Sequence, residues 1–241
     1  QLTDGEFNIS MAGWSPDGSR VVFFSRGRIY TISSEGGDPG ILWRGRGARI
    51  QSLDLSPDGK YIAFSGRVME ELDSHGRHVY RNADIWVIPV KGGEPKCLTA
   101  DFDRTVARGA SVKWSPDSKY VYVKFPNHGT RHIYRVSLKG EVEALTEGKM
   151  NIGSFTMDEA GKVFAFNASG PMTPTELWIL DDGGQAKRTE MNGTLLSKLR
   201  LVEPEEFWFT ASDGVKVQGW IVKPHELKEG EKYPMVSFIH G

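Results

Sequence analysis

Short apolar runs separated by polar turns recur along residues 1–190, with the β-branched and aromatic composition that is typical of strands. The first run of each repeat covers residues 21–24, 61–64, 120–123 and 163–166. A second run follows at residues 29–32, 85–88, 133–136 and 177–180. No amphipathic helix pattern interrupts them, so this part of the chain is predicted to be almost wholly β.

A turn motif precedes each first run. Ser-Pro-Asp-Gly begins at Ser15 and Ser56, and Ser-Pro-Asp-Ser begins at Ser115. A degenerate fourth copy of the motif is predicted at residues 155–162, with Thr156 in the serine position. Pro presets φ for a turn, Asp bonds back to the backbone, and Gly accepts a left-handed conformation. Repeats spaced by ~40–60 residues, each with several short strands, predict the blades of a β-propeller, because unrelated hairpins of a sandwich would not repeat one motif order.

Glycine-rich turns and a short closing segment complete each repeat. The turns lie at residues 36–39, 92–95, 139–141 and 183–185, where positive φ suits a tight hairpin. The closing segments are predicted at residues 41–43, 97–99, 144–146 and 187–189. Four tryptophans fall on repeated strand positions and are predicted to form the core between blades: Trp14, Trp86, Trp114 and Trp178.

The repeat frame predicts a propeller portion and the start of a second domain. The propeller portion is expected at residues 1–194, with blades at about 3–42, 43–98, 99–145 and 146–189. Residues 1–5 resemble the last strand of a blade, and residues 233–239 read as a buried strand that ends the chain. We therefore expect a piece cut at both ends, with about four blades of a seven- or eight-bladed ring. A closed four-bladed ring stays open as an alternative.

Composition and charge exclude several classes of protein. The 241 residues carry 30 Lys and Arg against 31 Asp and Glu, so neither sign dominates, and neither a nucleic-acid nor a membrane partner is expected. A lone cysteine, Cys97, cannot form an internal disulfide, which favours a reducing, cytoplasmic location. No run approaches the ~18 apolar residues that span a bilayer, and residues 1–5 do not resemble a signal peptide.

The tail carries the most specific signals. After a linker comes a hairpin with its turn at residues 212–214, then a Gly219-Trp220 strand, and then Tyr-Pro and an apolar run that ends in His240-Gly241. Together with the Ser-Pro-Asp-Gly blades, this order resembles the prolyl oligopeptidase family of serine peptidases, most of all its acylaminoacyl peptidase branch. The resemblance implies that residues 195–241 are a linker and the N-terminal strands of a truncated α/β-hydrolase domain. It also implies that His240 and Gly241 begin a glycine-rich loop that helps shape the oxyanion hole.

The same resemblance implies hydrolysis of short peptides, with the propeller restricting access to the active site. The family nucleophile lies on a Gly-x-Ser-x-Gly elbow, and that pattern is absent from the 241 residues. We therefore expect no catalytic residue in this chain, no activity of the chain alone and no cofactor. The expected partners are short peptides, the remaining blades and hydrolase domain of the same protein, and further copies in an oligomer.

An insert at residues 67–82 in the second blade is the best candidate for a functional loop of the propeller, because such insertions often reach toward the partner domain or the pore. Glu70, Glu71 and Arg77 are its candidate substrate-gating residues, since paired glutamates hold a substrate amine in dipeptidyl peptidases. A metal site is not expected from its other polar residues, because they have no fixed geometry in a loop: Asp73, His75 and His78. Two alternatives stay open, a dipeptidyl peptidase-like member and a non-catalytic propeller scaffold of the periplasmic Tol type.

Overall fold

A computed structural model describes residues 2, 8–45, 47–68, 74 and 82–239. Four four-stranded antiparallel blades follow one another along the chain; the first two are separate sheets, and the third and fourth are joined into one eight-stranded sheet. The first blade contains β1 (Ile9–Trp14), β2 (Arg20–Ser25), β3 (Arg28–Ser33) and β4 (Gly40–Arg44). The second contains β5 (Arg49–Leu55), β6 (Tyr61–Arg67), β7 (Asp84–Pro89) and β8 (Lys96–Cys97).

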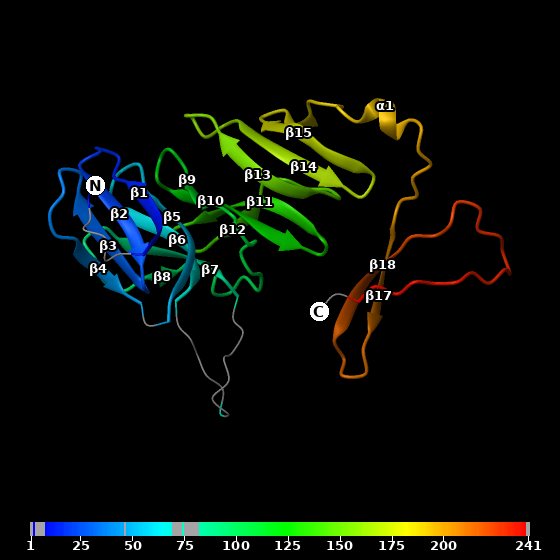
Figure 1. The fold of residues 1–241 in the computed structure, drawn as a ribbon, viewed down its shortest axis with the longest axis horizontal. Helices are drawn as coiled ribbons and strands as arrows, with labels where there is room; N and C mark the ends of the chain where they lie inside the picture. Colours follow the sequence, from blue (N-terminus) through cyan, green and yellow to red (C-terminus); the bar gives the residue numbers. More distant parts are fainter. Residues whose placement is uncertain (1, 3–7, 46, 69–73, 75–81, 240–241) are drawn as a thin grey trace.

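The third and fourth blades repeat this plan. The third contains β9 (Lys113–Trp114), β10 (Tyr120–Asn127), β11 (Thr130–Ser137) and β12 (Val142–Ala144). The fourth contains β13 (Asn151–Met157), β14 (Phe164–Gly170), β15 (Thr173–Asp181) and β16 (Gly184–Lys187). A parallel bridge between Arg131 and Asn151 links the two blades. Figure 1 shows the four blades side by side, which confirms the prediction of a mainly β chain with part of a propeller.

The serine of each turn motif closes the loop between the first two strands. In the third blade, Ser115 Oγ accepts the amide N–H of Tyr120 at 2.9 Å and that of Lys119 at 3.1 Å, and it donates to Asp117 Oδ1 at 2.7 Å. Ser56 makes the same three bonds, and Ser15 makes two of them, accepting the Arg20 amide and donating to Asp17 Oδ1. The motif therefore has a physical role, because one hydroxyl satisfies the backbone groups that the turn would leave unpaired.

The fourth copy of the motif lies two residues later than predicted. Asp158 takes the serine position: its amide N–H donates to the carbonyl of Val163, as Ser115 donates to Tyr120. Its Oδ1 accepts the amides of Lys162 at 2.7 Å and Val163 at 3.0 Å. Thr156 instead lies inside β13, opposite Ala165. The prediction was wrong because a carboxylate can accept the same two amides as the serine hydroxyl.

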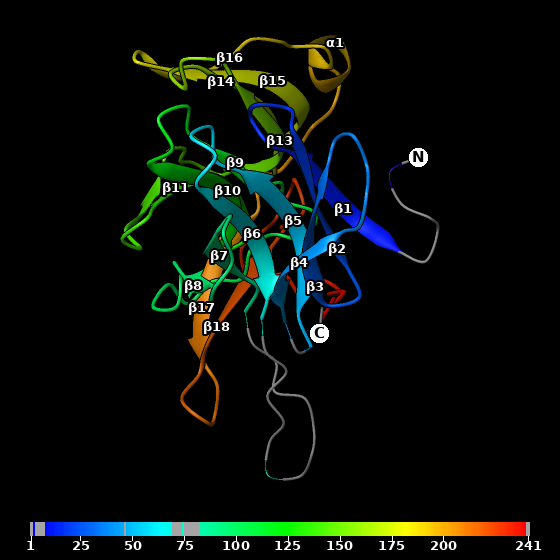
Figure 2. The same cartoon turned by 90° about the vertical axis from the view of Figure 1, so that its left-hand side faces the viewer.

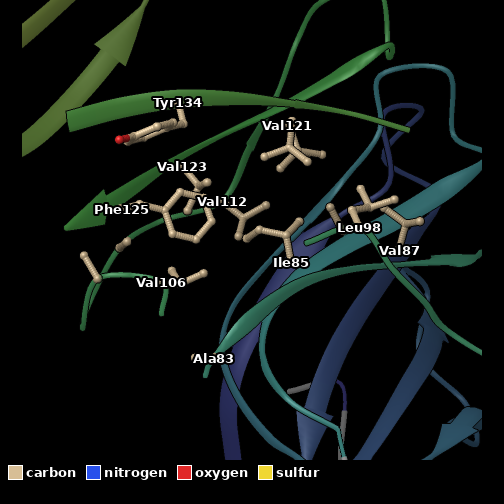
Figure 3. Packing of buried hydrophobic residues seen from close by; sticks show 14 of the residues in the cluster. Ala83, Ile85, Val87, Leu98, Val106, Val112, Val121, Val123, Phe125 and Tyr134 are labelled. Atoms are coloured by element: carbon tan, nitrogen blue, oxygen red, sulfur yellow. The ribbon is translucent and has the colours of Figure 1, made fainter. Parts of the chain in front are cut away.

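Apolar side chains between neighbouring blades form the core. Figure 3 shows this packing between the second and third blades, where Ile85 and Val87 of β7 belong to one buried cluster with Val121 and Val123 of β10. Trp114 is only 2% exposed, and its indole N–H donates to the carbonyl of Asp54 in the preceding blade at 3.0 Å. The prediction of an inter-blade tryptophan is confirmed at this position.

Trp14 has the same place in the first blade as Trp114 in the third, yet it is 61% exposed. Each pairs with the residue one position into the second strand, Val21 and Val121 respectively. No sheet of the described chain lies beside Trp14 as the second blade lies beside Trp114. The predicted inter-blade core is therefore wrong for Trp14 in this structure, because burial here depends on the neighbouring blade.

The tail leaves the fourth blade through a short helix, α1 (Gly193–Leu196), and forms the predicted hairpin from β17 (Glu205–Thr210) and β18 (Lys216–Ile221). The prediction of a buried strand at residues 233–239 is wrong here. These residues form no strand, and Val236 is 94% exposed. An apolar strand needs neighbouring strands to accept its backbone hydrogen bonds, and no described sheet provides them beside this segment.

Substituting the two equivalent tryptophans tests the role of inter-blade burial. We expect Trp114→Ala to lower the free energy of unfolding by about 3–5 kcal/mol, because it empties a buried site between two blades. Trp14→Ala is the matched control and should cost less than about 1 kcal/mol, because most of its surface is already in water. Urea denaturation of both variants measures the difference, and equal losses would contradict the packing described above.

The turn motif also predicts an acidic titration. The Ser15 hydroxyl, with the Ser19 amide and hydroxyl, lowers the pKa of Asp17 to about 2. Since the folded pKa lies below the unfolded value, this group favours folding above pH ~4, and the contribution is lost as the pH falls through about 2. Carboxyl NMR should find the low midpoint in the wild type and a higher one in Ser15→Ala. An ordinary midpoint in the wild type would refute the prediction.

Candidate functional site

One face of the propeller carries the turns between the second and third strands of the first, third and fourth blades. These turns are residues 26–27, 128–129 and 171–172, together with the strand ends at Arg67 and Asp84. We call this the hairpin face. Its turns emerge on one side because the blades are stacked in the same orientation, and the tail hairpin extends on that side as well (Figures 1 and 2).

The candidate residues of the insert and of the chain's end lie outside the described residues. This applies to the proposed gating residues, to the polar residues beside them and to the oxyanion-loop residues: Glu70, Glu71, Asp73, His75, Arg77, His78, His240 and Gly241. Their roles therefore stay predictions. The strands on either side of the insert, β6 and β7, end and begin at the hairpin face, at Arg67 and Asp84.

The tail hairpin contacts the tip of the third blade on this face. Gln218 Nε2 of β18 donates to the carbonyl of His128 at 3.3 Å. The His128 ring meets the Trp208 ring edge-on, with 5.3 Å between the centroids. Glu206 Oε1 accepts both the indole N–H of Trp208 at 2.6 Å and the amide of Gln218 at 2.9 Å. One carboxylate thus fixes the two side chains that contact His128.

These contacts set the local electrostatics. The hydrogen bonds from Gln218 and Trp208 lower the pKa of Glu206, so it is charged at neutral pH. Just before β17, Glu203 Oε1 lies 2.5 Å from Lys149 Nζ and raises the pKa of that lysine. Both partners are largely exposed, and such pairs contribute little stability. We infer that the Lys149–Glu203 pair mainly orients the linker where it crosses from the propeller to the hairpin.

A cavity of about 400 Å³ lies at this junction. Its walls come from the turns of the third and fourth blades and from the tail: residues 128–130, Lys149, Asn151, 170–171, Pro204, Glu206, Trp220 and Val222. Its volume is within the ~300–1,000 Å³ typical of ligand sites. Gly129, at φ +75°, allows the close approach of Trp220, because an added Cβ would lie 2.4 Å from Trp220 Cζ2.

The described residues show no assembled catalytic group at this cavity. His132 and Thr146 have the side chains of a base and a nucleophile, 3.2 Å apart, but both are buried, and Thr146 also accepts the Ile133 amide. Burial lowers the pKa of His132. The pair is structural. Within the described ranges, no group of His, Cys, Asp and Glu is placed to hold a metal ion, and no helix could span a membrane.

Sequence reasoning missed the docking of the tail on the third blade. A His-Gly pair between two strand-like runs does indicate a tight turn, and His128 has φ 47°. Nothing local indicates that Trp208 and Gln218, some eighty to ninety positions later, lie against it.

Substituting Gly129 should detach the tail hairpin. We expect Gly129→Ala to displace Trp220 and to speed hydrogen exchange of the β18 amides, because the new Cβ would overlap the indole ring. Gly109→Ala is the matched control, since Gly109 has φ +70° and nothing within 4 Å of the added Cβ. Exchange measured by mass spectrometry compares the two variants. Equal protection of β18 in both would contradict the docking contact.

Known proteins resemble this chain in sequence across most of its length. No protein-family profile matches it. The uncharacterized peptidase YuxL of Bacillus subtilis is 28% identical over 78% of this chain and 37% of its own length. Dipeptidyl-peptidase 5 of Porphyromonas gingivalis is 25% identical over 95% of this chain and 34% of its own length. The chain therefore spans about a third of these relatives.

Solved structures resemble the chain in fold. An acylaminoacyl peptidase in complex with Z-Gly-Gly-Phe-chloromethyl ketone has a TM-score of 0.51 at 19% identity, covering 94% of this chain and 52% of that one. TolB of Acinetobacter baumannii has a TM-score of 0.55 at 18% identity, covering 92% of this chain and 53% of that one. Both support a propeller fold. The chain is therefore similar in sequence to peptidases and similar in fold to an acylaminoacyl peptidase and to TolB.

Proposed function

We propose that this chain is part of a longer serine peptidase that hydrolyses short peptides. Residues 1–194 supply blades of the propeller, and residues 195–241 cross into an α/β-hydrolase domain and begin it. The Ser, Asp and His of the catalytic triad lie outside this chain, so the chain alone does not hydrolyse peptides. The single cysteine is consistent with a cytoplasmic enzyme.

Sequence similarity to a peptidase that continues into the tail carries this proposal. The 25% identity to dipeptidyl-peptidase 5 covers 95% of the chain, so it must include most of residues 195–241. The docking of β17 and β18 on the hairpin face supports it, because it directs the second domain toward that face. A domain held over a ring of blades leaves only narrow access for substrates and keeps bulk water away from the chemistry.

Two substrate classes fit the relatives. The fold neighbours include acylaminoacyl peptidases, whose name implies removal of a blocked terminal residue. Several sequence relatives are named dipeptidyl-peptidase 5, whose name implies release of dipeptides. Sequence similarity favours the dipeptidyl peptidase activity, and similarity in fold favours the acylaminoacyl peptidase activity. The TolB likeness keeps a non-catalytic scaffold as the third candidate, but a scaffold gives no reason for similarity to a peptidase across the tail.

Reading the gene past codon 241 and assaying its full product tests the proposal. We expect a Gly-x-Ser-x-Gly elbow within roughly 120 residues downstream, followed by Asp and then His. The full-length protein should release p-nitroaniline from acetyl-alanine or alanyl-alanine p-nitroanilide, which separates the two substrate classes. A serine-directed fluorophosphonate should abolish this activity, and the 241-residue chain alone should show none.

Two controls make the assay specific. Replacing the elbow serine by alanine should remove activity without changing the circular dichroism spectrum. A stably folded small protein should resist cleavage by the full-length enzyme. Short synthetic peptides with the same sequence should be cleaved. A continuing reading frame without the elbow, or activity unaffected by the fluorophosphonate, would reject the serine peptidase.

A further inference from the structure

A basic hollow lies on the hairpin face at the first blade. Its volume is about 680 Å³, and the described charged residues that line it are arginines: Arg26, Arg28, Arg44 and Arg49. The whole chain is close to neutral, with a net charge of -1. A local excess of one sign in a neutral protein therefore needs its own explanation.

The strand registers place like charges opposite one another here. Arg28 of β3 pairs directly with Arg44 of β4. On the next blade, Arg49 of β5 pairs directly with Arg67 of β6. Like charges directly opposite in antiparallel strands repel and destabilise the pair. The opposition of Arg28 and Arg44 in the first blade indicates a surface that is completed by a negatively charged group.

Arg26, Arg28 and Arg44 have no carboxylate partner among the described residues. Arg28 Nη1 lies 3.5 Å from the Tyr30 hydroxyl, which bears no charge. Arg26 adopts φ 47°, a left-handed conformation that disfavours a residue with a long side chain. Position 26 of the turn is nevertheless an arginine, although Asn or Gly would adopt this positive φ with less strain. Strained positions of this kind concentrate at functional sites.

Two of the glycines that line the hollow allow tight packing beneath it. Gly45 lies so close to Trp43 that an added Cβ would be 2.1 Å from Trp43 Cη2. At Gly27, an added Cβ would meet the carbonyl oxygen of Gly45 at 3.0 Å. Glycine at both positions therefore permits the close approach of the Gly27 and Gly45 backbone beside the arginines.

We propose that this hollow binds the carboxylate groups of short peptides, with Arg28 and Arg44 as its principal ligands. Guanidinium groups bind carboxylates through paired hydrogen bonds, which neutralises the repulsion between the two arginines. The choice of a peptide rests on the proposed function and on the location of the hollow, which shares the hairpin face with the docked tail. The carboxylate comes either from the peptide C-terminus or from an acidic side chain.

Peptide binding to the 241-residue chain tests the site without any catalytic step. The probes are tetra-alanine with a free C-terminus, its C-terminal amide, and Ala-Ala-Glu-Glu amide, titrated by calorimetry at low ionic strength. We expect both carboxylate-bearing peptides to bind at least about tenfold more tightly than the neutral amide. The stronger of the two shows which carboxylate the hollow prefers. High salt should weaken binding, because the arginines are exposed.

Arginine variants localise the binding. Arg28→Gln and Arg44→Gln should each weaken carboxylate binding by about tenfold, and Arg44→Lys should weaken it less, because it keeps the charge but loses the paired geometry. Arg20→Gln is the matched control: Arg20 lies at the other end of β2, where its Nε donates to Thr31 Oγ1 at 3.1 Å. Circular dichroism verifies folding of each variant.

A second readout follows from the like-charge opposition. Without peptide, Arg44→Gln should have a melting temperature equal to or above that of the wild type. Added carboxylate peptide should raise the melting temperature of the wild type but not that of Arg44→Gln. Equal affinity for the carboxylate and amide peptides, or equal loss of affinity in Arg20→Gln, would overturn the proposal. Because no step needs hydrolysis, a full-length protein without peptidase activity would reject the proposed function while leaving this binding result intact.

Discussion

The stacking of one blade's apolar face on the next is the interaction on which the rest of this structure depends. A four-stranded blade buries little surface by itself, so its stability comes from nearest neighbours. Trp114 shows this directly: it is buried against Asp54 and Tyr61 of the preceding blade, whereas Trp14, in the same register, is 61% exposed. The neighbour, rather than the local sequence, decides whether the side chain is core.

Stacking in one orientation also determines where function can lie. The turns between the second and third strands of the first, third and fourth blades emerge on the hairpin face. That face therefore collects the strand ends of the insert, the arginine hollow at the first blade and the docked tail at the third. The turns on the opposite face repeat the Ser-Asp pattern and are satisfied internally. The repeated turns of the opposite face keep the blades in register. The turns and loops of the hairpin face can therefore differ between blades, as is common where loops carry function.

Local chemistry was predictable from the sequence, and long-range contacts were not. The Ser-Pro-Asp-Gly turns and alternating runs predicted the blades and the tail hairpin, because each depends on adjacent residues. The fourth copy was placed two residues early because Asp158 replaces serine with another acceptor. Residues 233–239 were predicted to be buried from apolarity alone, which does not provide a pairing strand. The contact between His128 and Gln218 joins residues 90 positions apart, and no local pattern indicates it.

Native-state hydrogen exchange across the four blades measures the central interaction most directly. If neighbour stacking supports the fold, amides of β6, β7, β10 and β11, whose blades are covered on both faces, should exchange slowest. Amides of β2 and β15, in the first and fourth blades, should exchange through openings of lower free energy. Uniform protection across all four blades, or the slowest exchange in the first blade, would contradict the account.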